Sequence, residues 1–417
     1  MRQSQLFSKT RKKAPADEVA LNAQLLIQSG FIHKEMAGVY AFLPLGLRVR
    51  NKIEQIIREE MNAVGGQEVK LAALQREELW SATDRWSDDS IDVWFKTKLK
   101  NDTPVGLATT HEEPLTQLLT QHIDSYRDLP TAVYQFQTKF RNELRSKSGI
   151  MRGREFLMKD LYSFSRTKEE HEDFYTQMKE AYERIFDRTG IGNETFYTYA
   201  DGGSFSDYSH EFQTVSEAGE DTIYIHDEDG VAINKEMVND ETLEKLNVKK
   251  EDLREARAIE VGNIFPLGTR FSDALGLTFK GEDGDEKPVI MGSYGIGVGR
   301  LMGTIVETMA DESGFIWPES ISPFKVHLLA LGGSDDVATA ADEAYKQLQE
   351  IGVEVLYDDR DTHPGDKFGD SDLIGIPTQL VVGNKTIDKD GFEITDRSKA
   401  DAQPESVSLD EVIKRIS

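Results

Sequence analysis

An alternation of apolar and polar side chains over residues 134–143 is the clearest local pattern in this chain. The even positions from 134 to 140 carry aromatic residues or threonine, and the odd positions from 135 to 143 carry amides or charged groups. Side chains two residues apart lie on the same side of a strand, so the pattern predicts a strand with a core face and a polar face. A second apolar-rich strand is predicted over residues 154–164, after a loop with two glycines. We therefore predict an antiparallel hairpin with a long loop.

Helical periodicity marks several other segments. Apolar residues on one helical face predict a long helix over residues 45–64, closed by Gly65 and Gly66. Similar spacing predicts helices over residues 18–29 and 168–189. Pro114 is suited to a first helical turn and predicts a helix over residues 115–126. Short strands are predicted over residues 67–74, 105–109 and 288–296.

The pattern changes after residues 317–323, which form a proline-containing linker. Strands and helices then alternate, which predicts a small α/β domain. Its predicted elements are strand 325–331, helix 338–351, strand 353–357, helix 367–373, strand 379–382 and helix 409–416. Residues 214–260 are acidic and mixed, and predict only a small hairpin and a helix near residues 241–246.

Composition narrows the class of protein. The 417 residues suffice for two or three domains. Cysteine is absent, which excludes disulfides, thiolate zinc sites and cysteine nucleophiles, fits a reducing compartment and leads us to expect a cytoplasmic location. No window is apolar over 18 residues, so we expect no membrane span. The first 16 residues hold five cations and no acid, and we favour a flexible or tRNA-facing arm over a transit peptide.

Cationic side chains near the hairpin turn suggest an anion site. Arg141, Arg145, Lys147 and Arg152 lie there, and arginine pairs with phosphate oxygens through two bonds at once. Phe156 on the return strand is suited to stacking on a base. The alternative is a solvated, charge-rich hairpin.

Two further strings carry candidate chemistry. The glycine-rich residues 292–299 precede a helix with Arg300 in its first turn. A cation there is disfavoured by the helix dipole, so we expect a phosphate to compensate it; a dinucleotide loop is disfavoured because no βαβ unit begins here. The string Thr-His-Glu at 110–112 precedes Pro114 and fits either helix capping or ligand binding.

KFRNE at residues 139–143, followed by GREFLMKDLYSF, resembles motif 2 of class II aminoacyl-tRNA synthetases, and most of all that of bacterial-type prolyl-tRNA synthetases. The resemblance covers nearly the whole chain. It implies an α+β catalytic domain, with an antiparallel sheet flanked by helices, plus a small C-terminal α/β anticodon-binding domain. The implied catalytic domain is 1–213 with 261–318, a short remnant of the editing insertion is 214–260, and the anticodon-binding domain is 323–417. For this last domain, an unassigned or flavodoxin-like α/β fold is the alternative.

The resemblance assigns roles in ATP binding. Arg141 would bind the α-phosphate and orient the amino-acid carboxylate, while Arg152 and Arg300 would hold the β- and γ-phosphates with Mg²⁺. Glu143 would contact adenine and Phe156 would stack under it. Glu211 and Gln213 would lie near the nucleotide, with Glu211 as a Mg²⁺ ligand.

A second set of residues would bind L-proline. Thr110 and Glu112 match a Thr-x-Glu loop that holds the amino acid, because a buried carboxylate pairs with the cationic secondary amine. His210 and Ser293 would wall the pocket. The family string before Ser209–Phe212 departs here, since Asp207 and Tyr208 replace smaller residues.

Resemblance also bears on assembly and fidelity. Residues 45–74 resemble motif 1, the dimer interface in the family, and imply a homodimer, although Ala72 stands at about the place of the family proline. Residues 214–260 are too short for the long editing domain, which implies that mischarged alanyl-tRNA(Pro) is not edited in cis. Since alanine fits a proline pocket, either a separate trans-editing protein removes the error or the error is tolerated.

The net charge of −26 requires tRNA(Pro) to meet local basic patches, and predicts salt-sensitive binding. Arg360 and Lys367 are the candidate anticodon contacts. Three alternative functions are disfavoured. A non-charging binding protein would be expected to lose motif residues, a related threonine, serine, glycine or histidine enzyme does not fit the Thr-x-Glu loop, and a hydrolase lacks a Gly-x-Ser-x-Gly elbow.

Overall fold

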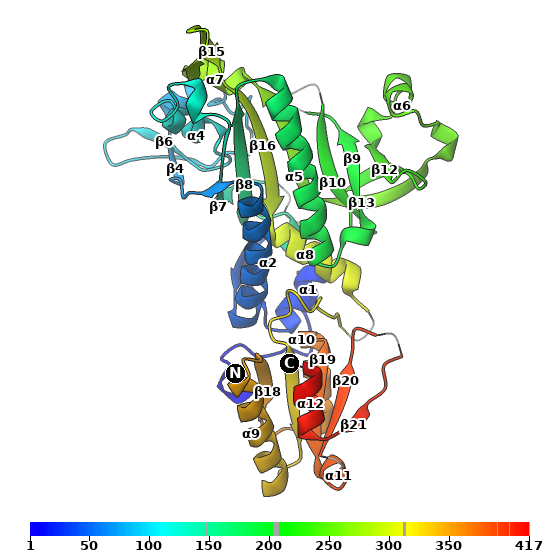
Figure 1. The fold of residues 1–417 in the computed structure, drawn as a ribbon. Coiled ribbons are helices and arrows are strands. Elements are labelled where there is room, and N and C mark those ends of the chain that lie inside the picture. Colours follow the sequence, from blue (N-terminus) through cyan, green and yellow to red (C-terminus); the bar gives the residue numbers. More distant parts are fainter. Residues whose placement is uncertain are drawn as a thin grey trace. The chain divides into compact units, whose positions relative to one another are not determined.

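The computed structural model describes residues 1–144, 146, 148–202, 208–311, 314–389, 391–399 and 401–416. Its contacts divide the chain into two compact units, each described by itself (Figure 1). The larger unit comprises residues 36–39 and 53–304, and the smaller comprises residues 1–35, 40–52 and 305–417. In the described part of the chain, no helix combines the length and apolar character needed to cross a membrane.

A nine-stranded sheet of described residues forms the centre of the larger unit (Figure 1). β3 pairs with β7 and β12 with β9 in parallel, and the other neighbouring strands are antiparallel. The predicted antiparallel sheet of an α+β domain is confirmed. In sheet order the strands are β10 (Ser209–Val215), β9 (Thr195–Ala200), β12 (Val231–Asn234), β11 (Asp221–His226), β13 (Arg254–Gly268), β16 (Ile290–Gly297), β8 (Glu155–Ser165), β7 (Thr131–Phe140) and β3 (Gln67–Glu68).

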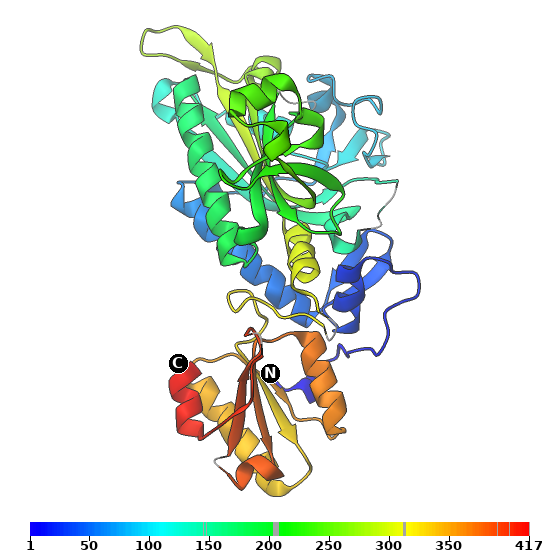
Figure 2. The ribbon, with the colours of Figure 1, turned by 90° about the vertical axis from the view of Figure 1, so that its right-hand side faces the viewer.

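One face of this sheet is covered by α5 (Lys168–Arg188), as Figures 1 and 2 show. Tyr182 and Phe186 of this helix pack on Phe212 of β10, with ring centres 5.2 and 5.3 Å apart. The apolar stripe predicted for the helix is therefore its packing face. The stripe predicted for α2 (Pro44–Ala63) is also buried, at Val49, Ile53, Ile56, Ile57 and Met61.

The opposite face of the sheet carries the polar residues of β7. The sequence pattern suggested that this polar face would meet a charged ligand. In the structure, however, Gln135, Gln137 and Lys139 are buried. A segment around Leu71 covers them: its backbone N–H donates to Gln135 Oε1 (3.0 Å), and the Gln137 amide donates to its carbonyl. These side-chain bonds replace strand pairing, so the strand predicted over residues 67–74 is instead two short pieces, β3 and β4 (Leu74–Arg76).

The helix predicted over residues 115–126 is also shifted. α4 begins at Glu112 and ends at Leu119. Pro114 is its third residue, still within the first turn, where a missing N–H leaves no intrahelical bond unmade. The other elements of this unit include α3 (Glu77–Ser81), β5 (Lys96–Lys98), β6 (Pro104–Leu107), α7 (Arg270–Leu275), β14 (Thr278–Lys280) and β15 (Glu286–Pro288).

Residues 214–260 contain the predicted hairpin, as β11 and β12, and the predicted helix, as α6 (Asp240–Leu246). Both strands belong to the nine-stranded sheet. β10 runs through residue 213 and β13 runs through residue 260. The domain boundaries at these two positions stay a prediction.

The smaller unit contains a five-stranded sheet of described residues in the order β18 (Val355–Asp358), β17 (Val326–Leu331), β19 (Thr378–Gly383), β20 (Phe392–Asp396) and β21 (Glu405–Val407). α9 (Asp335–Glu350) and α12 (Leu409–Ile416) lie on one face and α10 (Pro364–Ile374) on the other (Figure 2). The predicted alternation of strands and helices is confirmed. The sequence pattern did not predict β20, β21 and α11 (Asn384–Ile387).

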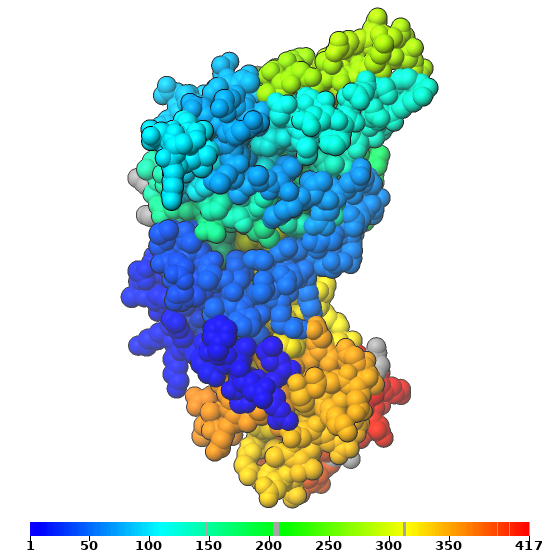
Figure 3. Space-filling view, turned by 90° about the vertical axis from the view of Figure 1, so that its left-hand side faces the viewer, coloured from blue at the N-terminus to red at the C-terminus, as the bar shows by residue number. Residues whose placement is uncertain are grey.

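The N-terminal residues lie against this same unit (Figure 3). The backbone of Arg2 forms an isolated parallel β-bridge with that of Tyr357. Gln3 is buried, and its Oε1 lies 3.1 Å from His327 Nε2. Arg2 also pairs with Asp342 at 2.9 Å. The expectation of a flexible arm is therefore wrong for the first residues. α1 (Leu21–Gln28), β1 (Ile32–Met36) and β2 (Val39–Phe42) follow.

Candidate active site

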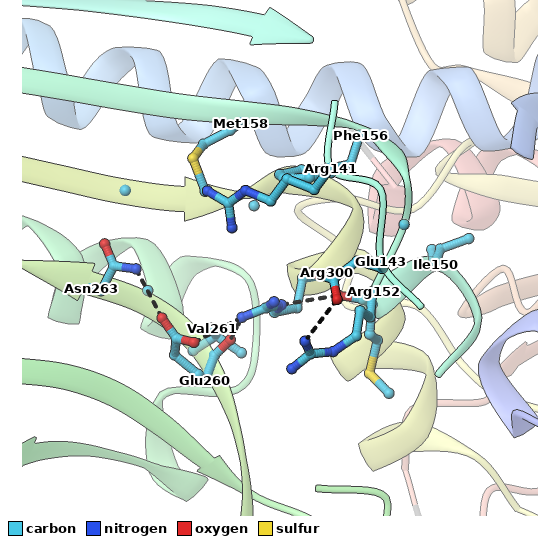
Figure 4. Close-up of a pocket in the computed structure, with 15 residues that line it drawn as sticks. Arg141, Glu143, Ile150, Arg152, Phe156, Met158, Glu260, Val261, Asn263 and Arg300 are labelled. Carbon is cyan, nitrogen blue, oxygen red and sulfur yellow. Dashed lines mark hydrogen bonds and ion pairs between the residues drawn. The ribbon is translucent and has the colours of Figure 1, made fainter. Parts of the chain in front are cut away.

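A cleft of about 620 Å³ opens on the polar face of the nine-stranded sheet (Figure 4). Arg141 and Arg152 from the hairpin line it together with Arg300, the third residue of α8 (Val298–Met309). Their guanidinium groups face one opening (Figure 4). Segments about 150 residues apart thus bring three cations together, as an anion site requires. The rest of the lining is Glu143, Ile150, Met151, Gly153, Phe156, Met158, Glu260, Val261, Gly262, Asn263, Gly295 and Gly297.

Arg141 is the cation of this cleft that lacks a counter-ion. Within the described residues, no carboxylate lies within ion-pair distance of it. Its Nη2 makes one long contact of 3.5 Å to the Thr109 carbonyl, and its guanidinium lies 5.3 Å from the ring centre of Phe156. Burial, followed by repulsion from Arg300, lowers the pKa of Arg141. An anion bound here would relieve both effects.

Arg300 is already compensated by the protein. Its Nη1 lies 3.0 Å from Glu260 Oε2, and its Nε donates to the Met151 carbonyl at 2.9 Å. Asn263 holds Glu260 from the other side, donating to Oε1 at 2.8 Å. Glu260 therefore supplies compensation of the kind that the sequence argument expected at this helix start, and a phosphate at Arg300 stays a prediction.

Arg152 is likewise paired, to Glu220 at 2.6 Å and to Glu143 at 3.6 Å. Arg154 fixes the start of the hairpin loop by donating to the Glu143 carbonyl at 2.9 and 3.0 Å. The side chains of both acidic partners are partly exposed. An anionic ligand could therefore replace either of them at Arg152. Arg145 and Lys147 lie outside the described residues.

Gly295 lines the cleft beside Asn263. A methyl group there would lie 2.9 Å from Asn263 Oδ1, closer than carbon and oxygen normally approach. Phe156 and Met158 supply apolar surface beside it. This part of the cleft is therefore partly apolar, which suits a base.

The Thr110–Glu112 loop lies in the same unit, and Glu112 is buried. Its Oε2 accepts from Thr110 Oγ1 at 2.5 Å and its Oε1 from Tyr162 OH at 3.2 Å. Arg85 Nη1 is 3.7 Å from Glu112 and 2.9 Å from Glu113. Burial raises the pKa of Glu113 to about 7. One guanidinium therefore serves two adjacent carboxyl groups, and helix capping is not their main contact.

His210 lies on the helix-covered face and is not among the cleft-lining residues. Its Nδ1 is 2.9 Å from Tyr175 OH of α5, and its ring stacks on Tyr197 at 4.4 Å. Burial lowers the pKa of His210 to about 4. Ser209–Phe212 forms the start of β10, so consecutive side chains point to opposite faces. Asp207 lies outside the described residues.

Glu211, the next residue, lies on the cleft face, paired in register with Asn263. Gln213 donates to its Oε2 at 2.9 Å. Burial, followed by repulsion from Glu260, raises the pKa of Glu211 to about 8. Ser293 is buried on the same face, in register with Tyr162, so it lies at the Glu112 end of the site.

Two carboxyl groups that repel each other fit a hard cation. Both Glu211 and Glu260 carry carboxylate oxygens, and Mg²⁺ commonly binds in proteins through one or two carboxylates plus substrate phosphates. No cluster of three or more potential metal ligands occurs in the described part of the chain.

Several site residues were missed by sequence reasoning, namely Glu220, Glu260, Asn263, Arg85 and Tyr162. They acquire their positions through strand register or long-range pairing, so no local pattern marks them. The candidate anticodon cations of the smaller unit are internally paired. Lys367 is buried and donates to the Ala330 carbonyl at 2.6 Å, and Arg360 pairs with Asp358 and Asp370 at 2.6 and 2.8 Å.

Family models match most of the chain. The class II core domain of tRNA synthetases (G, H, P, S and T) matches residues 95–309, and the anticodon binding domain matches residues 325–417. A crystal structure of prolyl-tRNA synthetase from Cryptosporidium parvum, complexed with halofuginone and AMPPNP, shares the fold. Its TM-score is 0.78 at 17% identity, covering 95% of this chain and 75% of that chain.

Curated relatives match the chain along its length. The proline–tRNA ligase of Rhizorhabdus wittichii is 39% identical over 441 aligned positions that cover all of both chains. That of Caulobacter vibrioides is 40% identical over 441 positions, covering 99% of this chain and 98% of its own. The chain therefore belongs to the class II aminoacyl-tRNA synthetases and, within them, to the proline–tRNA ligases.

Proposed function

We propose that this enzyme joins L-proline to tRNA(Pro) in two steps, with ATP as the energy source and prolyl-adenylate as the intermediate. The observation that carries this proposal is the cleft cation Arg141, which lacks a carboxylate partner in the described residues. An unbalanced guanidinium between Phe156 and the Thr109 carbonyl favours an incoming anion. The α-phosphate of ATP and the carboxylate of proline are both such anions.

In the first step, a carboxylate oxygen of proline forms a bond to the α-phosphorus of ATP, and pyrophosphate leaves. Charge neutralisation and positioning are the main requirements of phosphoryl transfer. Arg141 neutralises the α-phosphate and orients the carboxylate. Arg300 and Arg152 take the β- and γ-phosphates, exchanging contacts with Glu260 and Glu220.

Adenine lies on Phe156, and Glu143 contacts its edge. Glu211 would hold a Mg²⁺ ion, which would supply further positive charge beside the phosphates. Gln213 holds the Glu211 carboxyl in place through its 2.9 Å bond.

The secondary amine of proline binds Glu112, whose carboxylate is oriented by Thr110 and Tyr162. Ser293 walls this end of the pocket. His210, expected as another wall, contacts Tyr175 and Tyr197, which supports a packing role instead.

In the second step, the terminal ribose hydroxyl of tRNA(Pro) attacks the prolyl carbonyl, and AMP leaves. The family match of residues 325–417 supports anticodon recognition by the smaller unit. Because Arg360 and Lys367 are paired internally, we assign the anticodon contacts to other residues of this unit.

We also propose that the enzyme does not edit alanyl-tRNA(Pro) in cis. Residues 214–260 are built into the nine-stranded sheet, and the R. wittichii relative, whose whole chain fits within 441 aligned positions, leaves no room for a domain-sized insertion either. Either a separate trans-editing protein then removes the mischarged product, or the error is tolerated. We further propose a cytoplasmic homodimer, which sedimentation would test.

Proline-dependent exchange of pyrophosphate into ATP tests the proposal. The R141A variant should lose about 10³-fold or more in this activity, comparable to the loss of one transition-state donor, while its circular dichroism stays unchanged. Arg166, at the far end of the hairpin and paired with Glu170, provides the matched control R166A, which should stay within about twofold of wild type. A folded R141A enzyme with full activity would refute the assignment.

A further inference from the structure

Three ionisable side chains lie fully inside the protein beside the Thr110–Glu112 loop. His111 and Lys139 are 0% exposed and Asp160 is 3% exposed. Removing an ammonium and a carboxylate from water costs several kcal/mol each unless they are paired and hydrogen-bonded. Well-packed apolar residues often fill such a space with equal or greater stability. A contribution to folding stability therefore does not explain why three ionisable residues are buried here.

Lys139 is the hydrogen-bond donor that joins the three groups. Lys139 Nζ donates to Asp160 Oδ2 at 2.9 Å and also to His111 Nδ1. An ammonium group has no acceptor, so His111 Nδ1 accepts and its proton sits on Nε2. Nε2 then donates to the Ala72 carbonyl, 3.1 Å away. Burial, followed by the charge of Lys139, lowers the pKa of His111 to about 4, which keeps the ring neutral as this pattern requires.

The chain of bonds ends on three different parts of the fold. Asp160 is on β8 and also accepts from Gln135 of β7 at 3.0 Å. Ala72 lies in the segment between β3 and β4. His111 stands between Thr110 and Glu112, at the N-cap of α4. A single ammonium group therefore ties the loop to the central hairpin and to the covering segment.

The Glu112 carboxylate depends on the position of this loop. Tyr162 OH lies 3.3 Å from the His111 backbone nitrogen and 3.2 Å from Glu112 Oε1. A shift of His111 would move the carboxylate relative to Tyr162. Lys139 and Arg141 lie on the same side of the hairpin, two residues apart. The link therefore also sets the loop relative to Arg141.

We propose that Lys139 is a positioning residue for the amino-acid site, acting through His111 and Asp160 to hold the Thr110–Glu112 loop. It sets affinity and selectivity for proline and leaves nucleotide binding unchanged. This inference rests on the proposed function, because it assumes that Glu112 binds the amine of proline.

Two variants test the proposal without leaving a charge stranded. K139M/D160N removes both charges with little change in volume. H111N keeps the Lys139–Asp160 pair and places asparagine at an N-cap, where it is well tolerated, but its short side chain cannot span from Lys139 to the Ala72 carbonyl. Lys159, equally buried on the neighbouring strand and bonded to Tyr182 OH at 2.7 Å, gives the matched control K159M.

In both test variants the KM for proline in pyrophosphate exchange should rise about tenfold to a hundredfold, and the preference for proline over alanine should fall. The Kd of a non-hydrolysable ATP analogue, measured by calorimetry without proline, should stay within twofold. K159M should change neither quantity by more than twofold.

The proposal is overturned if either folded variant keeps the wild-type KM for proline, or if the Kd of the analogue rises by the same factor as the KM. E112Q separates this outcome from failure of the proposed function. If E112Q raises the KM for proline and H111N does not, only the positioning role fails. If wild type shows no proline-dependent exchange, or E112Q changes nothing, the function itself is wrong.

Discussion

The two faces of the β7–β8 hairpin each bury a lysine, and they treat it differently. Lys139, on the cleft face, donates to the carboxylate of Asp160 at 2.9 Å. Lys159, on the helix-covered face, donates to Tyr182 OH and lies 3.6 Å from Met61 Sδ, with no carboxylate in ion-pair distance among the described residues. Burial lowers the pKa of both lysines, and well below the ordinary value for Lys159.

This contrast shows that burial alone does not mark a functional residue. The bonds of Lys139 reach separate segments, including the loop that carries Glu112, so a change there is transmitted to a substrate contact. The bonds of Lys159 stay between the sheet and the helices that pack on it. The kind of partner, and the segment that supplies it, separates the two faces.

The same substitution on the two faces should therefore have opposite effects on stability. K139M strands the buried Asp160 carboxylate and should lower the free energy of unfolding by about 3–5 kcal/mol. K159M removes a buried ammonium whose pKa is lowered on folding, and should raise it by about 1–2 kcal/mol at pH 7. Such a lysine destabilises the fold only while the unfolded residue is protonated, so the gain from K159M should vanish as the pH rises past about 10.

Urea unfolding followed by circular dichroism measures both values, with exposed Lys168 giving the control K168M. Equal losses in K139M and K159M would contradict the distinction between the faces.

A pH series should reveal the repulsion between carboxyl groups on the cleft face. The pKa of Glu211 is raised from 4.5 to about 8, so between these values the folded protein binds more protons than the unfolded chain. Stability should then fall as the pH rises from 6 to 8, by at most about 1.4 kcal/mol per pH unit from this group. E211Q should flatten the curve, although Glu113, shifted in the same direction, keeps part of it.

Thermal unfolding at several pH values provides this measurement, and E172Q on the exposed surface of α5 should retain the wild-type slope. A slope unchanged in E211Q would show that the carboxyl ionises normally.

Removal of one hydroxyl should give the smallest effect and test the place of His210. Y175F deletes contacts of 2.9 Å to His210 Nδ1 and 3.0 Å to the Ile264 carbonyl. We expect a loss of about 1 kcal/mol in stability and a KM for proline within twofold of wild type. A clear rise in that KM, measured by pyrophosphate exchange, would place His210 in the proline pocket after all.

Local patterns in the sequence predicted the elements that local physics determines. The alternation at residues 134–140 located β7, and the apolar stripes located α2 and α5. The glycines before Arg300 located β16 and α8. These features depend on neighbours a few residues away.

The rest depends on contacts that no local pattern records. Residues 67–74 alternate weakly, and side chains from β7 take their backbone bonds. Glu260 balances Arg300 only because β13 and β16 pair in one register. The alternation correctly predicted which side chains of β7 lie on its polar face. Whether that face contacts solvent, ligand or protein depends on segments far away in the sequence.

The bridge between Arg2 and Tyr357 has a consequence for biosynthesis. Residues 53–304 of the larger unit leave the ribosome before the partners of Arg2 and Gln3 have been made. We expect the larger unit to fold first during translation, since domains generally fold as units as they emerge. Arg2 and Gln3 must then wait, without these contacts, until the chain has been synthesised through Tyr357.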